Sequence, residues 1–277
     1  MRWDTTSGVD CMRALATLKW VASRCLVGLA IVMASSMSTA ADTLPSLIAK
    51  LKPSVLAVGF YKETQNPRFG FSGTGFIVGD GNLLVTNAHV IAGATKDEAG
   101  AGSLVVYTPG ASGQDSMRRL EVIEVDKAHD LALLRFEGSA LPVLTLGPAR
   151  AAREGQMVAF IGFPMGSSLG LSPVTHRGIV SAIASVALPS PSARQLDSRA
   201  IKTLKDGAFE LLQLDATAYP GNSGGPLFDA ESGAVVGVVN MVALKGTRES
   251  ALSQPSGITY AIPVEHVLRL LARNEGK

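Results

Sequence analysis

The chain has 277 residues, of which 47% are hydrophobic and 17% charged, so it can bury a sizeable core. Only 5% of the residues are aromatic, which predicts a mainly aliphatic core. The 25 basic and 23 acidic residues nearly balance, and this composition offers no support for a nucleic-acid partner.

The first 40 residues are typical of a secretory leader. Basic residues precede an apolar stretch (25–37), and the small residues Ser38 and Ala40 follow it. We expect a signal peptide over 1–40 with cleavage after Ala40, and therefore a periplasmic or secreted protein. The alternative is an uncleaved membrane anchor, although the apolar stretch is short for a full span of about 20 residues.

Removal of this leader changes the chemistry that the mature chain can carry. Both cysteines, Cys11 and Cys25, lie within it, so a disulfide framework, a thiolate metal site and a cysteine nucleophile are all excluded. The leader also contains four basic and two acidic residues, which leaves a neutral mature chain with 21 of each.

Beyond the leader, a short helix is expected at Leu44–Leu51, ending before Pro53. Apolar runs rich in β-branched residues then alternate with turn residues. The runs are 54–60, 73–78, 83–90, 103–108, 120–126, 131–136, 156–163, 177–185, 209–216 and 234–242. Asp80-Gly81 between two of them is a hairpin signal. Short strands without intervening helical patterns predict an all-β sandwich or barrel.

Two segments depart from this rhythm. Residues 186–206 are polar and contain prolines, so we expect a long loop of a kind that is often functional. Residues 263–273 predict a terminal helix with Pro263 at its first position. The buried face of this helix is expected to consist of Val264, Val267, Leu268 and Leu271.

The run AYPGNSGGPLFD (218–229) places Ser223 among glycines and prolines. A serine hydroxyl attacks a carbonyl only when a neighbouring base, usually histidine, is oriented by a third group. His89, in the run TNAHV, is the candidate base, and Asp130, which opens the run LALLRF, is the candidate carboxylate. The other histidines have plainer expectations: a surface position for His129, a structural role for His176 and a solvated position for His266.

The string GNSGG also fits the nucleophile elbow of α/β-hydrolases, in which the acid and the histidine follow the serine. Asp229 and His266 follow Ser223 in that order. However, PLFD after the serine predicts a strand where that fold requires a helix, and alternating strands and helices are not found upstream. The pattern therefore disfavours this alternative.

The order His, Asp, Ser in the contexts TNAHV, DLALL and PGNSGGP resembles the chymotrypsin-like serine proteases, and within them the HtrA/Deg group. The similar strings SGTGFIV, GFPMG, GIVSAI and GITYAIPVEHV extend the resemblance over most of the mature chain. It implies an all-β fold of two antiparallel six-stranded barrels with a C-terminal helix. The protease domain would span 41–277, with barrel one at about 53–147 and barrel two at about 154–262.

The resemblance also implies the active site, in a cleft between the barrels. His89 and Asp130 would come from barrel one and Ser223 from barrel two. The oxyanion hole would lie at Gly221, Asn222 and Ser223, with the amides of Gly221 and Ser223 facing the substrate.

Specificity and activation depart from the digestive proteases. Thr217 stands where an aspartate would select arginine or lysine, so we expect small or medium aliphatic residues at the cleaved position. Asn240, Met241 and Val242 would pair with the substrate backbone. Asn222 is uncharged and cannot bind a newly freed N-terminal amine, which argues against activation by N-terminal trimming.

The sequence thus predicts a serine endopeptidase that cleaves unfolded or flexible polypeptides, in envelope quality control or secreted proteolysis. The alternative is a non-catalytic, chaperone-like binding module that uses the same cleft. Neither a metal nor a cofactor is expected, and a membrane would be involved only through an uncleaved leader. The chain ends where the PDZ domains of HtrA proteins would begin, and its short first hairpin loop leaves trimer formation, common in the group, open.

Overall fold

The computed structural model describes residues 43–93, 102–108, 116–166, 170–186, 209–240 and 257–274. The expected signal peptide (1–40) and residues 187–206 of the expected long loop lie outside these ranges. No helix within the described ranges is both long and apolar enough to cross a bilayer.

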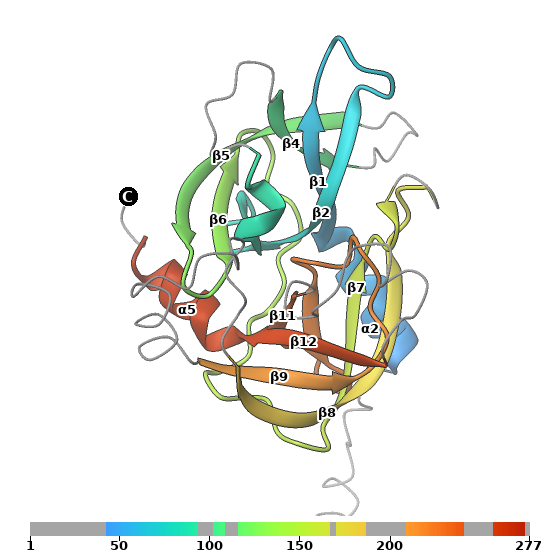
Figure 1. The fold of residues 1–277 in the computed structure, drawn as a ribbon, viewed down its shortest axis with the longest axis vertical. Coiled ribbons are helices and arrows are strands. Elements are labelled where there is room, and N and C mark those ends of the chain that lie inside the picture. Colours follow the sequence, from blue (N-terminus) through green and yellow to red (C-terminus); the bar gives the residue numbers. More distant parts are fainter. Residues whose placement is uncertain are drawn as a thin grey trace, which may run out of the picture. The chain divides into compact units, whose positions relative to one another are not determined.

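Barrel one is closed and antiparallel throughout, with strand order β1-β2-β3-β6-β5-β4 (Figure 1). Its strands are β1 (Val55–Tyr61), β2 (Phe69–Val78), β3 (Leu83–Asn87), β4 (Ser103–Thr108), β5 (Ser116–Asp126) and β6 (Leu131–Phe136). The Asp80-Gly81 turn joins β2 to β3, as its sequence predicts.

Barrel two is also closed and antiparallel, with strand order β10-β11-β12-β9-β8-β7. Its strands are β7 (Met157–Gly162), β8 (Val174–Val186), β9 (Phe209–Asp215), β10 (Pro226–Asp229), β11 (Val235–Asn240) and β12 (Ile258–Pro263). The two barrels confirm the all-β fold class and leave no place for the strand–helix alternation of an α/β-hydrolase.

The core is mainly aliphatic and has three parts. Barrel one encloses a cluster that includes Leu56 and Ile77, and barrel two encloses one that includes Leu214 and Leu227. A third cluster joins strands of both barrels to Val267 of the C-terminal helix. Burial of each such side chain contributes roughly 1.5–3 kcal/mol, so this shared cluster helps to fix the barrels against each other.

The helices of the described ranges are short. Helix α2 (Leu44–Leu51) has the bounds expected from sequence, and η1 (Lys52–Ser54) leads from it into β1. The run 83–90 was expected to be a single strand. Instead, β3 ends at Asn87 and helix η2 (Ala88–Ile91) follows it.

Helix α5 (Val264–Ala272) continues directly from β12 (Figure 1). Pro263 ends the strand and is the N-cap, so the prediction of proline inside the first turn was wrong. The buried residues are Val264, His266, Val267 and Leu270, whereas Leu268 and Leu271 are only half-buried. Val264 and Val267 are therefore buried as expected, but His266 and Leu270 take the places expected for Leu268 and Leu271. The expected face was chosen by hydrophobicity, which does not predict that the imidazole of His266 packs inward.

Candidate active site

Asp130 occupies the end of the β5–β6 turn in a left-handed conformation (φ 51°), which is strained for a non-glycine residue. Its carbonyl oxygen accepts hydrogen bonds from the amide of Ala88 (3.1 Å) and from Asn87 Nδ2 (3.0 Å). Its Oδ1 accepts the backbone N–H of His89 at 2.9 Å. These bonds fix the carboxylate next to η2.

The second carboxylate oxygen of Asp130 has two partners. Oδ2 lies 2.6 Å from His89 Nδ1 and accepts a hydrogen bond from Asn240 Nδ2 at 2.9 Å. A carboxylate only accepts, so the proton of a neutral His89 is on Nδ1 and Nε2 keeps its lone pair. The side chain of His89 is 31% exposed and that of Asp130 15%, so the base is the more accessible member of the pair.

Ser223 lies in a turn of barrel two that packs against the same part of barrel one. A Cβ on Gly73 would meet both the side chain of Val90 (2.6 Å) and the carbonyl oxygen of Ser223 (3.1 Å). Because Val90 directly follows His89, this contact brings the serine turn beside η2. Ser223 itself is only 5% exposed.

Thr74 of β2 connects barrel one to the serine turn through both its backbone and its hydroxyl. Its amide donates to the carbonyl of Ser223 (2.9 Å), and its hydroxyl donates to the carbonyl of Gly221 (2.6 Å). The hydroxyl also accepts the amide of Phe163 (3.2 Å), and the Thr74 carbonyl accepts the hydroxyl of Thr86 (2.6 Å). Thr74 was not among the residues predicted for the site, although it lies within the motif SGTGFIV.

Two glycines of the serine turn are required by geometry. Gly221 has φ 105°, and a Cβ there would lie 2.2 Å from the carbonyl oxygen of Phe163. Gly224 has φ 84°, and a Cβ there would lie 2.1 Å from the carbonyl oxygen of Thr74. Only glycine tolerates both the left-handed backbone and these approaches, which explains the spacing of GNSGG.

The peptide between Pro220 and Gly221 has a defined orientation. The Pro220 carbonyl accepts the amide of Met165 at 2.7 Å. In a trans peptide the N–H points opposite to the C=O, so the Gly221 N–H faces away from the turn that contains Met165. The predicted oxyanion amide is therefore not directed at that turn.

Of the residues predicted to bind substrate, two are described by the structure, Thr217 and Asn240, and they have different surroundings. Thr217 is half-buried, and its neighbours are held by Thr259 Oγ1, which donates to the Ala216 carbonyl (2.7 Å) and accepts the Ala218 amide (3.1 Å). Asn240 ends β11 and is buried, and its side chain donates a hydrogen bond to Asp130, 110 positions away, a contact that local sequence pattern cannot predict. Met241 and Val242 lie outside the described residues.

His266 and His129 were wrongly predicted to be solvated and at the surface. His266 is only 4% exposed, and its ring centroid lies 4.0 Å from that of His129 and 5.2 Å from that of Phe209. His129 is partly buried, and its Nδ1 lies 2.9 Å from Asp126 Oδ2. Burial, followed by the nearby His129 and Arg269, lowers the pKa of His266 to about 4, although Asp126 acts in the opposite direction.

Asp229, the acid of the α/β-hydrolase alternative, has a structural role at the β10–β11 turn. Its Oδ1 accepts the amides of Glu231 (3.1 Å) and Ser232 (2.7 Å), and its Oδ2 accepts Gln156 Nε2 (2.7 Å). Asp229 and His266 therefore have separate sets of partners and do not form the acid–histidine pair that an α/β-hydrolase would need.

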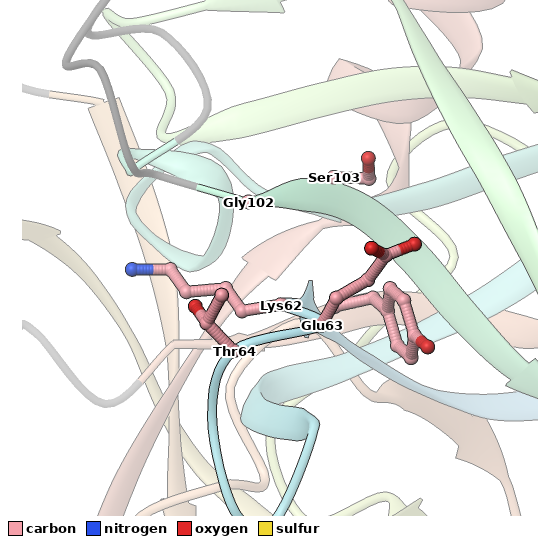
Figure 2. Close-up of a pocket in the computed structure, with 6 residues that line it drawn as sticks. Lys62, Glu63, Thr64, Gly102 and Ser103 are labelled. Atoms are coloured by element: carbon pink, nitrogen blue, oxygen red, sulfur yellow. The ribbon is translucent and has the colours of Figure 1, made fainter.

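A separate hollow, open to solvent, lies on barrel one, where the end of β1 meets the start of β4 (Figure 2). It is lined by Tyr61, Lys62, Glu63, Thr64, Gly102 and Ser103. None of the predicted site residues lines it, so it is distinct from the His89–Asp130 pair.

Two closed six-stranded barrels, with a histidine–aspartate pair beside a glycine-rich serine turn, define the chymotrypsin-like class. Residues 73–238 match the family described as the trypsin-like peptidase domain. The chain therefore belongs to the trypsin-like peptidase family, and its relatives are HtrA proteases.

Among these relatives, serine protease HTR4 of Bos taurus is 30% identical over 82% of this chain and 40% of its own length. A probable periplasmic serine endoprotease, DegP-like, of Halomonas elongata is 32% identical over 74% of this chain and 35% of its own length. The chain thus spans less than half the length of these relatives.

Two solved structures share the fold. That of Deg5 is 27% identical, with a TM-score of 0.57, and the match covers 80% of this chain and 89% of that one. That of the HtrA-type protease AlgW with a tripeptide is 25% identical, with a TM-score of 0.56, covering 83% of this chain and 63% of that one.

Proposed function

We propose that the chain is a serine endopeptidase in which Ser223, His89 and Asp130 form the catalytic triad. The observation that carries the proposal is the fixed His89–Asp130 contact of 2.6 Å beside the serine turn. It places the imidazole proton on Nδ1 and leaves Nε2 as a base, which is the arrangement that activates a serine.

In this mechanism the Ser223 hydroxyl attacks the substrate carbonyl while His89 Nε2 takes its proton. His89 then protonates the leaving amine, and water releases the acyl group by the same steps in reverse order. Asp130 stabilises the imidazolium, and the amides of Gly221 and Ser223 receive the oxyanion. Loss of one such donor raises the barrier by about 3 kcal/mol.

Polypeptides are the proposed substrates, unfolded or flexible ones above all, because the relatives are named proteases and the AlgW structure holds a tripeptide. Thr217 supplies no carboxylate, which favours an aliphatic residue over a basic one at the cleaved position. We place the protein in the periplasm or outside the cell, with 1–40 as signal peptide and 41–277 as protease domain, since its leader pattern agrees with the naming of a periplasmic relative.

The decisive test is labelling of the mature protein with a fluorophosphonate, together with cleavage of casein. Wild type is expected to be labelled and active, Ser223→Ala to be neither, and Ser181→Ala, at an exposed serine on β8, to match wild type. Absence of both labelling and casein cleavage in wild type would favour the non-catalytic binding module instead. Sequencing of the mature N-terminus tests the leader, with Ala41 as the expected first residue.

A further inference from the structure

Asn222, between Gly221 and Ser223, is fully buried within the serine turn (0% exposed). Its amide donates to the carbonyl of Tyr219, and its carbonyl accepts the amide of Gly225, both at 3.0 Å. The backbone on either side of Asn222 therefore carries the proposed oxyanion amides, so any movement of Asn222 moves those amides as well.

The side chain of Asn222 has one hydrogen-bond partner in the part of the chain that the structure describes, His176 of β8. Its Nδ2 lies 3.5 Å from His176 Nε2, at the long end of the hydrogen-bond range. Its Oδ1 is buried and has no hydrogen-bond partner among the described residues. The imidazole of His176 is thus the described polar group that determines how this buried amide is held.

His176 is itself held firmly from two sides. It pairs with Phe160 across β7 and β8, and the two rings stack with centroids 4.8 Å apart and planes 17° apart. The ring of Tyr219, whose carbonyl accepts the Asn222 amide, lies 6.1 Å away on the serine turn. Stacking on Phe160, together with the tilted ring of Tyr219, restricts the direction in which Nε2 points.

The chemistry of the contact requires a particular form of the imidazole. An amide nitrogen only donates, so Nε2 must accept, and the ring must be neutral with its proton on Nδ1. Burial lowers the pKa of His176, which keeps the ring neutral at neutral pH. Loss of Nε2 would leave both ends of the buried Asn222 amide unpaired, which is the costly outcome for a polar group.

We propose that His176 is a positioning residue for the serine turn: through its contact with Asn222 it holds the Gly221 and Ser223 amides in the geometry that acylation needs. This inference rests on the proposed endopeptidase function. It extends that function by assigning a role to a histidine outside the proposed triad.

The kinetic test compares His176→Phe, which keeps an aromatic ring against Phe160, with His176→Gln, which returns a hydrogen-bonding atom near the position of Nε2. We expect His176→Phe to lower kcat about fivefold with KM within about twofold, since one such contact is worth about 1 kcal/mol. His176→Gln should recover most of kcat. Thermal melting of each variant separates this effect from loss of the fold.

A double-mutant cycle tests whether the effect passes through Asn222. If it does, His176→Phe combined with Asn222→Ala is no slower than Asn222→Ala alone. Three results would overturn the inference: wild-type kcat in His176→Phe, no recovery in His176→Gln, or simple addition of the two effects.

A readout that needs no turnover separates this inference from the proposed function. In ¹⁵N-histidine NMR spectra of Ser223→Ala, the His176 Nε2 signal should be that of an unprotonated nitrogen, and Asn222→Ala should shift it. If this shift is seen but wild type does not react with the fluorophosphonate, the endopeptidase function is rejected while the contact between His176 and Asn222 is retained. If wild type reacts with the fluorophosphonate but Asn222→Ala leaves the His176 signal unchanged, only the positioning role of His176 is rejected.

Discussion

Two histidine–aspartate pairs meet at the β5–β6 turn, His129 with Asp126 and His89 of η2 with Asp130, yet only one has the surroundings of a base. His89 Nδ1 lies 2.6 Å from Asp130, and His129 Nδ1 lies 2.9 Å from Asp126. The His129 ring packs against the ring of His266, 4.0 Å away, and against that of Phe209. The side chains of His89 and His129 are 31% and 24% exposed, so exposure differs little between them. The packing of His129 against two other rings, more than the pairing itself, distinguishes the two histidines.

The two carboxylates also differ in their other partners. Burial alone would raise the pKa of Asp126, but hydrogen bonds from His129 and then Arg273 bring that pKa below its usual value. The Asp126 charge is therefore shared with a permanent cation, at 3.2 Å from Arg273. Asp130 is bonded to the neutral amide of Asn240, so its charge remains available to stabilise a protonated His89.

The largest expected effect comes from Asp130→Asn. An amide at this position would hold the wrong imidazole tautomer, and kcat should fall roughly 10⁴-fold. Steady-state kinetics on a peptide substrate measure this loss. The matched control is Asp126→Asn, which should leave kcat within about twofold of wild type while lowering the melting temperature. Equal kinetic losses in the two variants would remove the distinction between the pairs.

Acid destabilisation through His266 is the next largest effect. Its pKa is about 4 in the folded chain, against an ordinary value of 6.5, so the unfolded chain binds more protons between these pH values. The free energy of unfolding should therefore fall as pH drops from 6.5 to 4, by up to about 3 kcal/mol, and level off below.

Urea denaturation at several pH values checks this expectation. His266→Phe keeps a ring between His129 and Phe209 but cannot take up a proton, so its stability should vary less with pH than that of wild type. The same pH dependence in both proteins would show that the acid sensitivity arises elsewhere.

The smallest effect concerns the contact between the barrels at Asp130. Asn240→Ala removes the hydrogen bond to Oδ2, and a bond to a charged group is worth about 1.5–3 kcal/mol, so kcat should fall at least about tenfold. The loss should be much smaller than in Asp130→Asn because His89 keeps its carboxylate. A loss as large as that of Asp130→Asn would show instead that Asn240 is needed to hold Asp130 in place.

Local pattern was sufficient for much of the fold. Helix α2, β4 and β6 have the bounds expected from sequence, because propensity and alternation act over neighbouring residues. The strand β12 was missed because ITYAIP was considered only as part of a motif. The burial of His266 could not be predicted either, since it depends on how α5 packs against the turn that carries His129.

In the candidate site, too, some residues could be predicted from local motifs and others depend on long-range contacts. Ser223, His89 and Asp130 were proposed from short motifs and their order along the chain. Thr74 and Asn240 act through contacts with residues that are distant in sequence: the hydroxyl of Thr74 reaches a carbonyl 147 positions away. Periodicity carries no information about such contacts, so these supporting residues emerge only from the folded chain.

The hydrogen bonds of Thr74 affect the stage of folding at which the serine turn can become reactive. They tie Gly221 and Ser223 of barrel two to a strand of barrel one. A folding intermediate with only barrel two formed would lack this support for its serine turn. We therefore expect refolding to restore secondary structure before fluorophosphonate reactivity, so that the nascent chain is inert until its two halves have docked.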